Sequence, residues 1–173
     1  ARNIFYSALA TDLAQRTNSI VVAPNLSLLP FTFSGGCLIC STSQQAVADV
    51  FLDPTRGALV TSAQDAGYTG DVSELLGAFV LAGHSAGGGF AMATAADYVT
   101  EGSPIQDAQL LGVLMFDGVS NGTFDGTFDD QIAALADIPI YQIAAPAQAW
   151  NNFGATTNQL LAARPDMFNG AVL

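Results

Sequence analysis

One short segment holds the residue types that could do chemistry. It reads Gly83-His84-Ser85-Ala86-Gly87 and lies between an apolar run and a segment of helical composition. A serine in so tight a turn at the end of a strand presents its hydroxyl clear of the backbone. The Ala86 amide then points to where an oxyanion would develop, and the following helix adds the positive end of its dipole. Ser85 is therefore predicted to be a nucleophile, with the Ala86 N–H as one oxyanion donor.

The glycines of this segment have an expected structural role. Chain segments approach closely at such a turn, so positions 83 and 87 are both expected to require a small residue. One alternative is an inert, glycine-rich turn between a strand and a helix. A second is a nucleotide-binding loop, but the glycine spacing does not match the G-x-G-x-x-G pattern of such loops.

His84 is the single histidine of the 173-residue chain. Neighbouring residues in an extended segment point in different directions, so its ring is expected to face away from Ser85. We expect it to pack and hydrogen-bond beneath the turn. Because no other imidazole is present in the chain, the base for Ser85 is expected to come from elsewhere.

The elements that must position this segment follow from the apolar periodicity. Strands are expected over 19–27, 75–83, 108–118, 138–146 and 168–173. Helices are expected over 4–17, 43–52, 86–100 and 156–164, with shorter helical pieces within 55–73 and 129–136. The strands are continuous apolar runs, which is typical of parallel sheets. The predicted fold is a single α/β domain over 1–173, with a mostly parallel sheet and helices on both faces.

In this context the segment from Gly83 to Gly87 resembles the nucleophile elbow of the α/β-hydrolase superfamily, most closely the G-H-S-x-G elbows of bacterial lipases and esterases. The resemblance implies a partial α/β-hydrolase fold. It places the family's strands four to seven at 19–27, 77–84, 110–117 and 138–144. It also implies that the chain is an internal fragment, without the family's first strands and without the histidine that follows its eighth strand.

The resemblance further implies a triad in the order serine, acid, histidine. In the family the acid usually follows strand seven and in some members strand six. After the predicted seventh strand no carboxylate occurs before Asp166, whereas Asp117 ends the sixth. Asp117 is therefore the expected acid, and its alternative role is to cap nearby amides at the start of a loop. Asn151 and Asn152 lack the charge that would stabilise an imidazolium.

These features imply a serine hydrolase that cleaves carboxylic esters, of a small molecule or a lipid, through an acyl-enzyme. Ser85 would attack the carbonyl and Ala86 would hold the oxyanion. A histidine on a companion polypeptide segment outside this chain would take the proton, with Asp117 orienting it. No cofactor and no metal are expected. The alternative is a non-catalytic, hydrolase-like module for binding or structure, which keeps the elbow without its reactivity.

Charge and hydropathy limit the classes of partner that the sequence predicts. The formal net charge is −11, and the four basic residues are all arginine. Such a chain repels nucleic acid and anionic membranes at long range, so no nucleic-acid partner is expected. No apolar run approaches the ~18 residues of a transmembrane helix, so no transmembrane segment is expected. The acidic, lysine-free composition favours a secreted or cell-envelope location over a cytoplasmic one.

Two further groups of residues have open interpretations. Cys37 and Cys40 are expected in a loop, as a local disulfide or as two half-buried thiols. A zinc site, which takes about four ligands, is not expected in a chain with one histidine. Phe31, Phe33 and Phe51 either line an acyl pocket or pack in the core, and core packing is favoured.

Overall fold

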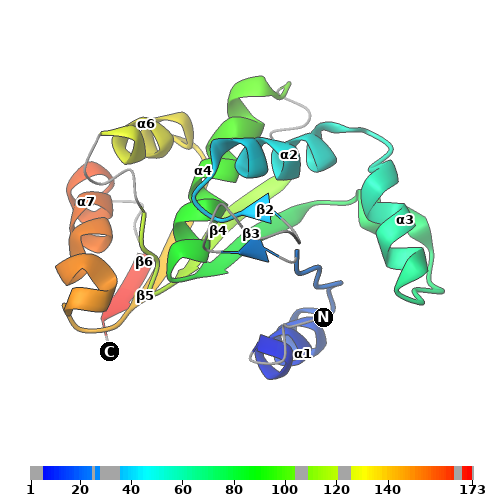
Figure 1. The fold of residues 1–173 in the computed structure, drawn as a ribbon, viewed down its shortest axis with the longest axis horizontal. Helices are drawn as coiled ribbons and strands as arrows, with labels where there is room; N and C mark the ends of the chain where they lie inside the picture. Colours follow the sequence, from blue (N-terminus) through cyan, green and yellow to red (C-terminus); the bar gives the residue numbers. More distant parts are fainter. Residues whose placement is uncertain are drawn as a thin grey trace.

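A computed structural model describes residues 6–24, 26–27, 36–103, 109–120, 126–165 and 169–172. Its centre is a four-stranded parallel sheet in the order β3-β4-β5-β6 (Figure 1). The strands are β3 (Phe79–His84), β4 (Leu110–Phe116), β5 (Ile140–Ala144) and β6 (Asn169–Val172). The predicted α/β class and parallel sheet are confirmed. Because the strands are parallel, the carboxyl ends of β3, β4 and β5 lie at one edge of the sheet.

Helices precede and separate these strands, as the periodicity predicts. The α-helices are α1 (Ser7–Thr17), α2 (Ser41–Leu52), α3 (Gly57–Asp65), α4 (Ala86–Glu101), α6 (Thr127–Ala134) and α7 (Ala155–Ala163). Two 3₁₀ segments, η2 (Val72–Leu76) and η4 (Ala149–Gly154), precede β3 and α7. None of the helices in the described part of the chain is long and apolar enough to span a bilayer.

One face of the sheet carries the core. Helix α4 packs on β3 and β4, with α2 and α6 beside it, and all three lie above the sheet in Figure 1. The core joins Val113 and Met115 of β4 to Met92 and Tyr98 of α4, each at most 1% exposed. Leu160 of α7 is buried in the same cluster. This packing fixes the direction in which α4 leaves the end of β3.

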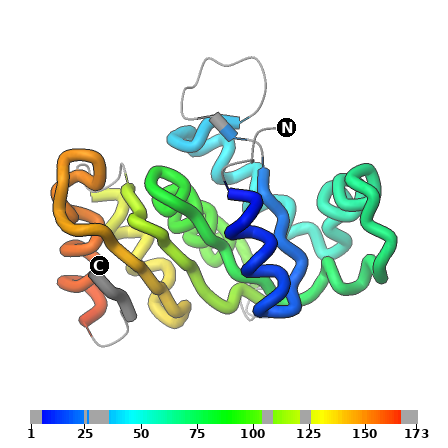
Figure 2. Tube along the Cα trace, turned by 90° about the horizontal axis from the view of Figure 1, so that it is seen from below, coloured from blue at the N-terminus to red at the C-terminus, as the bar shows by residue number. Residues whose placement is uncertain are grey.

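The opposite face of the sheet is largely uncovered by the described residues. Val80, Tyr141 and Ile143 are 46%, 40% and 46% exposed there. Helix α1 lies on this side (Figures 1 and 2), yet it has no buried residue. Helices therefore lie on both sides of the sheet, as predicted, but α1 does not form a full second layer. Strands β3 and β5 alternate between covered and exposed residues, and apolar residues on both sides concealed this alternation in the sequence.

The predicted strand over 19–27 is also wrong. Residues 19–24 are not in a strand, and Ile20 and Val22 are 41% and 51% exposed. Of the described residues in this range, only Leu26–Ser27 (β1) form a strand, which pairs in parallel with Gly36–Cys37 (β2) in a separate two-stranded sheet. β-Branched residues favour a strand only where a neighbouring strand supplies a ladder, and 19–24 forms none.

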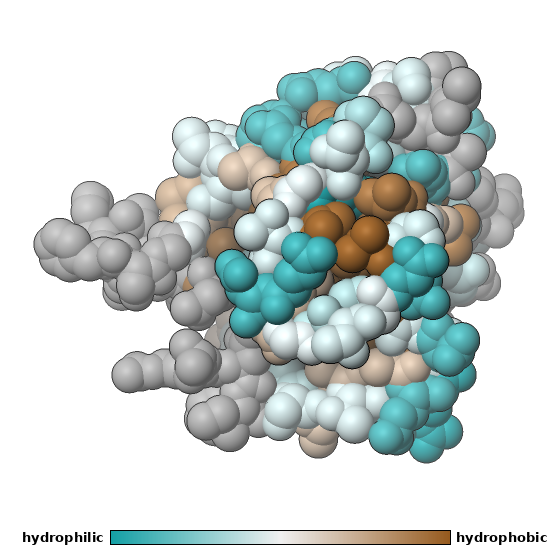
Figure 3. Space-filling model, turned by 90° about the vertical axis from the view of Figure 1, so that its right-hand side faces the viewer, coloured by the Kyte–Doolittle hydropathy of each residue, from teal (hydrophilic) through white to brown (hydrophobic). Residues whose placement is uncertain are grey.

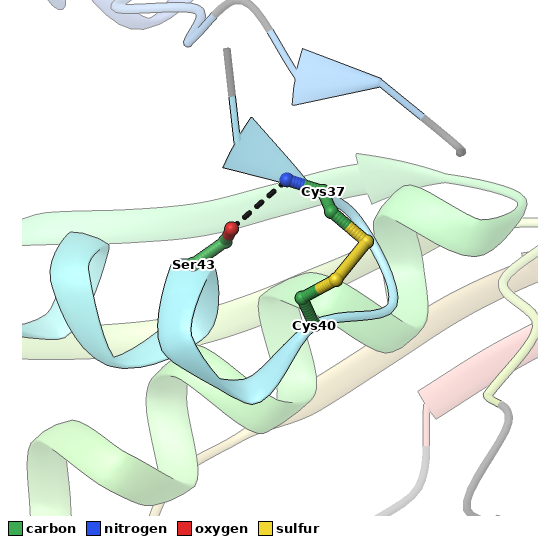
Figure 4. Close-up of a disulfide and its surroundings, with 3 residues drawn as sticks. All are labelled: Cys37, Cys40 and Ser43. Atoms are coloured by element: carbon green, nitrogen blue, oxygen red, sulfur yellow. Dashed lines mark hydrogen bonds between the residues drawn. A yellow bond between two sulfur atoms is a disulfide. The ribbon is translucent and has the colours of Figure 1, made fainter. Parts of the chain in front are cut away.

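The two cysteines form the local disulfide. Cys37 and Cys40 are bonded with their Cα atoms 5.2 Å apart (Figure 4). The Cys37 N–H donates a hydrogen bond of 2.9 Å to Ser43 Oγ on α2. Cys37 is 6% exposed. The bond and the hydrogen bond together fasten β2 to the start of α2.

The phenylalanines divide between core and undescribed positions. Phe51 stacks on Phe79 with ring centroids 4.1 Å apart and packs against the core. The core interpretation is therefore confirmed for Phe51. Phe31 and Phe33 lie outside the described residues.

A buried arginine organises the α3 end of the molecule. Arg56 is 3% exposed, and its guanidinium lies 5.2 Å and 5.1 Å from the ring centroids of Phe51 and Phe79. Burial lowers its pKa. Figure 3 shows the surface on this side, where a small hydrophobic area is framed by hydrophilic residues. The guanidinium donates hydrogen bonds of 2.7–2.8 Å to the carbonyl oxygens of Leu75 and Gly77 and to Gln109 Oε1.

Candidate functional site

Ser85 stands at the join between β3 and α4 in a strained conformation. Its φ is 53° and its ψ is −126°, a region that residues other than glycine rarely adopt. The Ser85 N–H donates to the Phe116 carbonyl at 3.0 Å. The Ser85 carbonyl accepts from the N–H groups of Gly88 and Val119 at 2.8 Å and 2.9 Å. The backbone of the predicted nucleophile is thus held by β4, by its own helix and by the loop after β4.

The glycines around Ser85 differ in what they permit. A Cβ added at Gly83 would overlap the carbonyl of Gly87, so the expected need for a small residue at 83 is confirmed. The same expectation at Gly87 is wrong, because a Cβ there would meet no atom of the described residues within 4 Å outside its chain neighbours and its own helix backbone. The tight positions are instead Gly88 and Gly89, which face the backbone of 118–120. Helical periodicity turns Gly87 outward and the next two glycines inward.

The Ala86 amide is positioned as an oxyanion donor would have to be. Ala86 is the first residue of α4, where N–H groups have no partner within the helix. This N–H donates no hydrogen bond to any described residue. It therefore combines an open donor with the positive end of the helix dipole, directly after Ser85.

Asp117 follows β4 at the same edge. The residues directly before Ser85 and Asp117 are His84 and Phe116, which are register partners in neighbouring strands. Paired strands lie ~4.8 Å apart, so Ser85 and Asp117 follow strand ends that are close neighbours. Asp117 is half-buried with a φ of 47°, and its N–H donates to the Ile143 carbonyl at 2.7 Å. Its Oδ1 accepts from the Ala145 N–H at 3.1 Å. Oδ2 accepts no hydrogen bond from the described part of the chain.

Asn151 is a residue of this site that the sequence did not reveal. It is 3% exposed and lies in η4, after β5. Its Nδ2 donates to Asp117 Oδ1 at 3.1 Å and to the carbonyls of Ala145 and Pro146 at 3.3 Å and 3.1 Å. Its Oδ1 accepts from the Gln148 N–H at 2.8 Å. The available signal was its place just after the strand that neighbours Asp117.

His84 makes a structural contact away from this cluster. Its Nδ1 forms a hydrogen bond of 2.8 Å with the Tyr6 hydroxyl, next to α1. The ring is exposed, as is Val80 on the same face of β3. The expected hydrogen-bonding role is present, but the expected packing beneath the turn is not. Among the described residues, Ser85 Oγ has no hydrogen bond to a base.

No arrangement for a metal ion is found within the described ranges, where no three His, Cys, Asp or Glu side chains gather suitably. Comparison of the chain with protein-family models, with curated proteins and with solved structures gives no match. Function must therefore be inferred from the chemistry at the carboxyl edge of the sheet. The groups there are Ser85, the Ala86 amide, and Asp117 with its partner Asn151.

Proposed function

We propose that this chain is the nucleophile-bearing part of a serine hydrolase of the α/β-hydrolase type, acting on carboxylic esters. The backbone of Ser85 carries the proposal. A residue in a sparsely populated region costs about 1–3 kcal/mol and persists only where its surroundings hold it. Strained residues are frequent at active sites. Here the strained residue is a serine at the end of a parallel strand, next to the Ala86 N–H, which donates no hydrogen bond to any described residue.

The proposed reaction is a two-step acyl transfer. Ser85 Oγ attacks the ester carbonyl carbon and gives its proton to an imidazole base, while the carbonyl oxygen becomes an oxyanion that the Ala86 N–H receives. Collapse of this intermediate breaks the bond to the alcohol, which leaves with the proton from the imidazolium. Water then attacks the acyl-enzyme through the same base and releases the acid.

Asp117 has the role of orienting the base. Its Oδ1 is held by Ala145 and Asn151, which leaves Oδ2 to accept an imidazole N–H. His84 cannot fill this place while it is bound to Tyr6 on the open face of the sheet. We propose that the base is a histidine on a companion segment outside the 173 residues.

A non-catalytic module is the second candidate. It is favoured by the lack of a base hydrogen-bonded to Ser85 within the described ranges. In that case the elbow would be a retained structural turn, and the Ser85 hydroxyl would be no more nucleophilic than an ordinary serine.

Chemical rescue separates the two candidates. The 173-residue chain is given a p-nitrophenyl ester and increasing imidazole, with Ser85→Ala as the control for hydrolysis by imidazole alone. The hydrolase proposal expects a rate that rises with imidazole and saturates, beyond that of Ser85→Ala. It also expects a fluorophosphonate to label Ser85, seen as a mass increase on its peptide. Equal rates in both proteins and no labelling at Ser85 would establish the non-catalytic module.

A further inference from the structure

Two aromatic residues belong to η4, the segment between β5 and α7 in the orange part of the chain in Figure 1. Trp150 and Phe153 are each 68% exposed. Large aromatic side chains gain more from burial than most others, so two exposed within four residues require a reason.

The backbone that presents Phe153 is strained. Asn152, Phe153 and Gly154 have φ values of 54°, 52° and 74°, three successive left-handed residues. For a residue with a side chain this conformation costs roughly 1–2 kcal/mol. A bulky phenylalanine in it is unusual. Burial of its ring does not compensate, because the ring is exposed. The local sequence therefore holds an aromatic ring outward at a cost to stability.

The same loop is tied to the proposed catalytic acid. Asn151, between the two aromatic residues, is buried and donates to Asp117 Oδ1. It also holds the loop to itself through the carbonyl of Pro146 and the N–H of Gln148. The loop that carries Trp150 and Phe153 is thus held to the border of the candidate site.

The chain around these aromatic residues carries no charge. Residues 138–163 include no Asp, Glu, Lys, Arg or His, although the whole chain has a net charge of −11. The remaining surface repels anions at long range. An uncharged aromatic surface on such a protein suits an uncharged, apolar partner. Tryptophan in particular favours the boundary between water and a lipid phase.

We propose that Trp150 and Phe153 form a docking surface for uncharged, water-insoluble esters at a lipid–water boundary. Docking would bring an ester bond to the edge where Ser85 and Asp117 lie. The link from docking to hydrolysis rests on the proposed function, whereas docking itself does not. The substrate class is therefore neutral lipid esters rather than anionic or freely soluble ones.

Trp150 reports on docking directly, because it is the only tryptophan of the chain. The Ser85→Ala protein, which cannot turn over substrate, is mixed with phosphatidylcholine-coated trioleoylglycerol droplets. The expected result is a blue shift of the emission and protection from acrylamide. Phosphatidylglycerol vesicles should produce neither effect, because their charge repels the chain.

Phe153→Gly is the matched variant. Glycine suits the left-handed backbone, so the fold is retained while the ring is removed. Apparent affinity for the droplets should fall roughly tenfold or more, the loss expected from one buried aromatic ring. Leu161→Ala, at a 45% exposed position on α7, should change the affinity less than about twofold, since a residue outside the docking surface contributes little.

Three outcomes would overturn the proposal: no blue shift with neutral droplets, equal binding to anionic vesicles, or unchanged affinity in Phe153→Gly. Failure of the proposed function has a different signature. A blue shift on droplets without any imidazole-supported, Ser85-dependent hydrolysis leaves the docking surface standing and removes the hydrolase. Ser85-dependent hydrolysis of a soluble ester without a blue shift on droplets leaves the hydrolase standing and removes the docking surface.

Discussion

Asn151 Nδ2 donates a hydrogen bond of 3.1 Å to Asp117 Oδ1 and so joins the loop after β5 to the end of β4. Asn151 is buried and Asp117 half-buried. A buried amide that fills its hydrogen-bonding capacity fixes the groups around it, and here it fixes one oxygen of a carboxylate. The other oxygen, Oδ2, is thereby held in place, and it accepts no hydrogen bond from the described residues.

Replacement of Asn151 by alanine should therefore impair the imidazole-supported rate. Displacement of a catalytic group by about 1 Å can lower a rate roughly 10²-fold, so we expect the imidazole-supported rate to fall by about tenfold to a hundredfold. Asn158→Ala, at an exposed position on α7, is the control and should retain the rate. Steady-state kinetics with a p-nitrophenyl ester measure both, and circular dichroism checks the fold. Equal rates in the two variants would contradict a positioning role for Asn151.

Gly83 and Gly87 should respond in opposite ways to alanine. At Gly83 the new methyl group would overlap the Gly87 carbonyl, so overpacking should lower the free energy of unfolding by about 3 kcal/mol. Gly87 lies in α4, and a methyl group there meets nothing within 4 Å in the described residues outside its chain neighbours and that helix's own backbone. There alanine should raise the free energy of unfolding by up to about 1 kcal/mol. Urea unfolding distinguishes the two, and comparable losses would contradict the packing described for this turn.

Arg56 and Arg16 provide a buried and an exposed cation for comparison. Arg56→Met leaves two carbonyl groups and Gln109 without their donor, and should cost roughly 3 kcal/mol of unfolding free energy. Among the residues that the structure describes, Arg16 pairs with Asp12 alone, on the surface of α1. Arg16→Met should cost at most about 0.5 kcal/mol. Thermal and urea unfolding measure both effects. A loss at Arg56 no larger than that at Arg16 would show that its hydrogen bonds are dispensable.

Asp97 should make stability depend on pH. Burial raises its pKa above the ordinary 3.8, and the nearby carboxylates of Glu101 and Asp49 add to this. Asp97 lines a crevice of about 270 Å³ together with Asp130 of α6. A raised folded pKa means that ionised Asp97 destabilises the fold. The penalty is absent well below 3.8 and grows as the pH rises through the folded pKa.

Asp97→Asn should consequently be more stable than the parent chain at pH 7 and equally stable at pH 3. Urea unfolding at both pH values tests this directly. A gain that is the same at both pH values would point to something other than ionisation.

Much of the fold was predictable because it depends on local periodicity. The predicted helices 43–52 and 86–100 and the strand 108–118 correspond to α2, α4 and β4 with ends shifted by a few residues. The run at 19–24 shows the limit of this reasoning. Ile20 and Val22 have the residue types of a strand, but a strand also requires a neighbour, which composition does not specify.

The site was predictable where a pattern is local and not where contacts are remote. The tight turn at Ser85 could be read from five consecutive residues, and the structure adds the positive φ that the turn requires. The hydrogen bond from Asn151 to Asp117 spans 34 positions of sequence. The place of Asn151 after β5 is the available signal, but it does not specify this bond, which arises from the parallel order of β4 and β5.

The uncovered face of the sheet has a consequence for colloidal stability. Val80, Tyr141 and Ile143 on this face are held apart from their copies on other molecules by the repulsion of a net charge of −11. Near the isoelectric point of about 4.1 that repulsion vanishes, while the attraction between apolar faces remains. The protein should therefore have a sharp solubility minimum near pH 4, and added salt, by screening the same charge, should promote self-association at neutral pH.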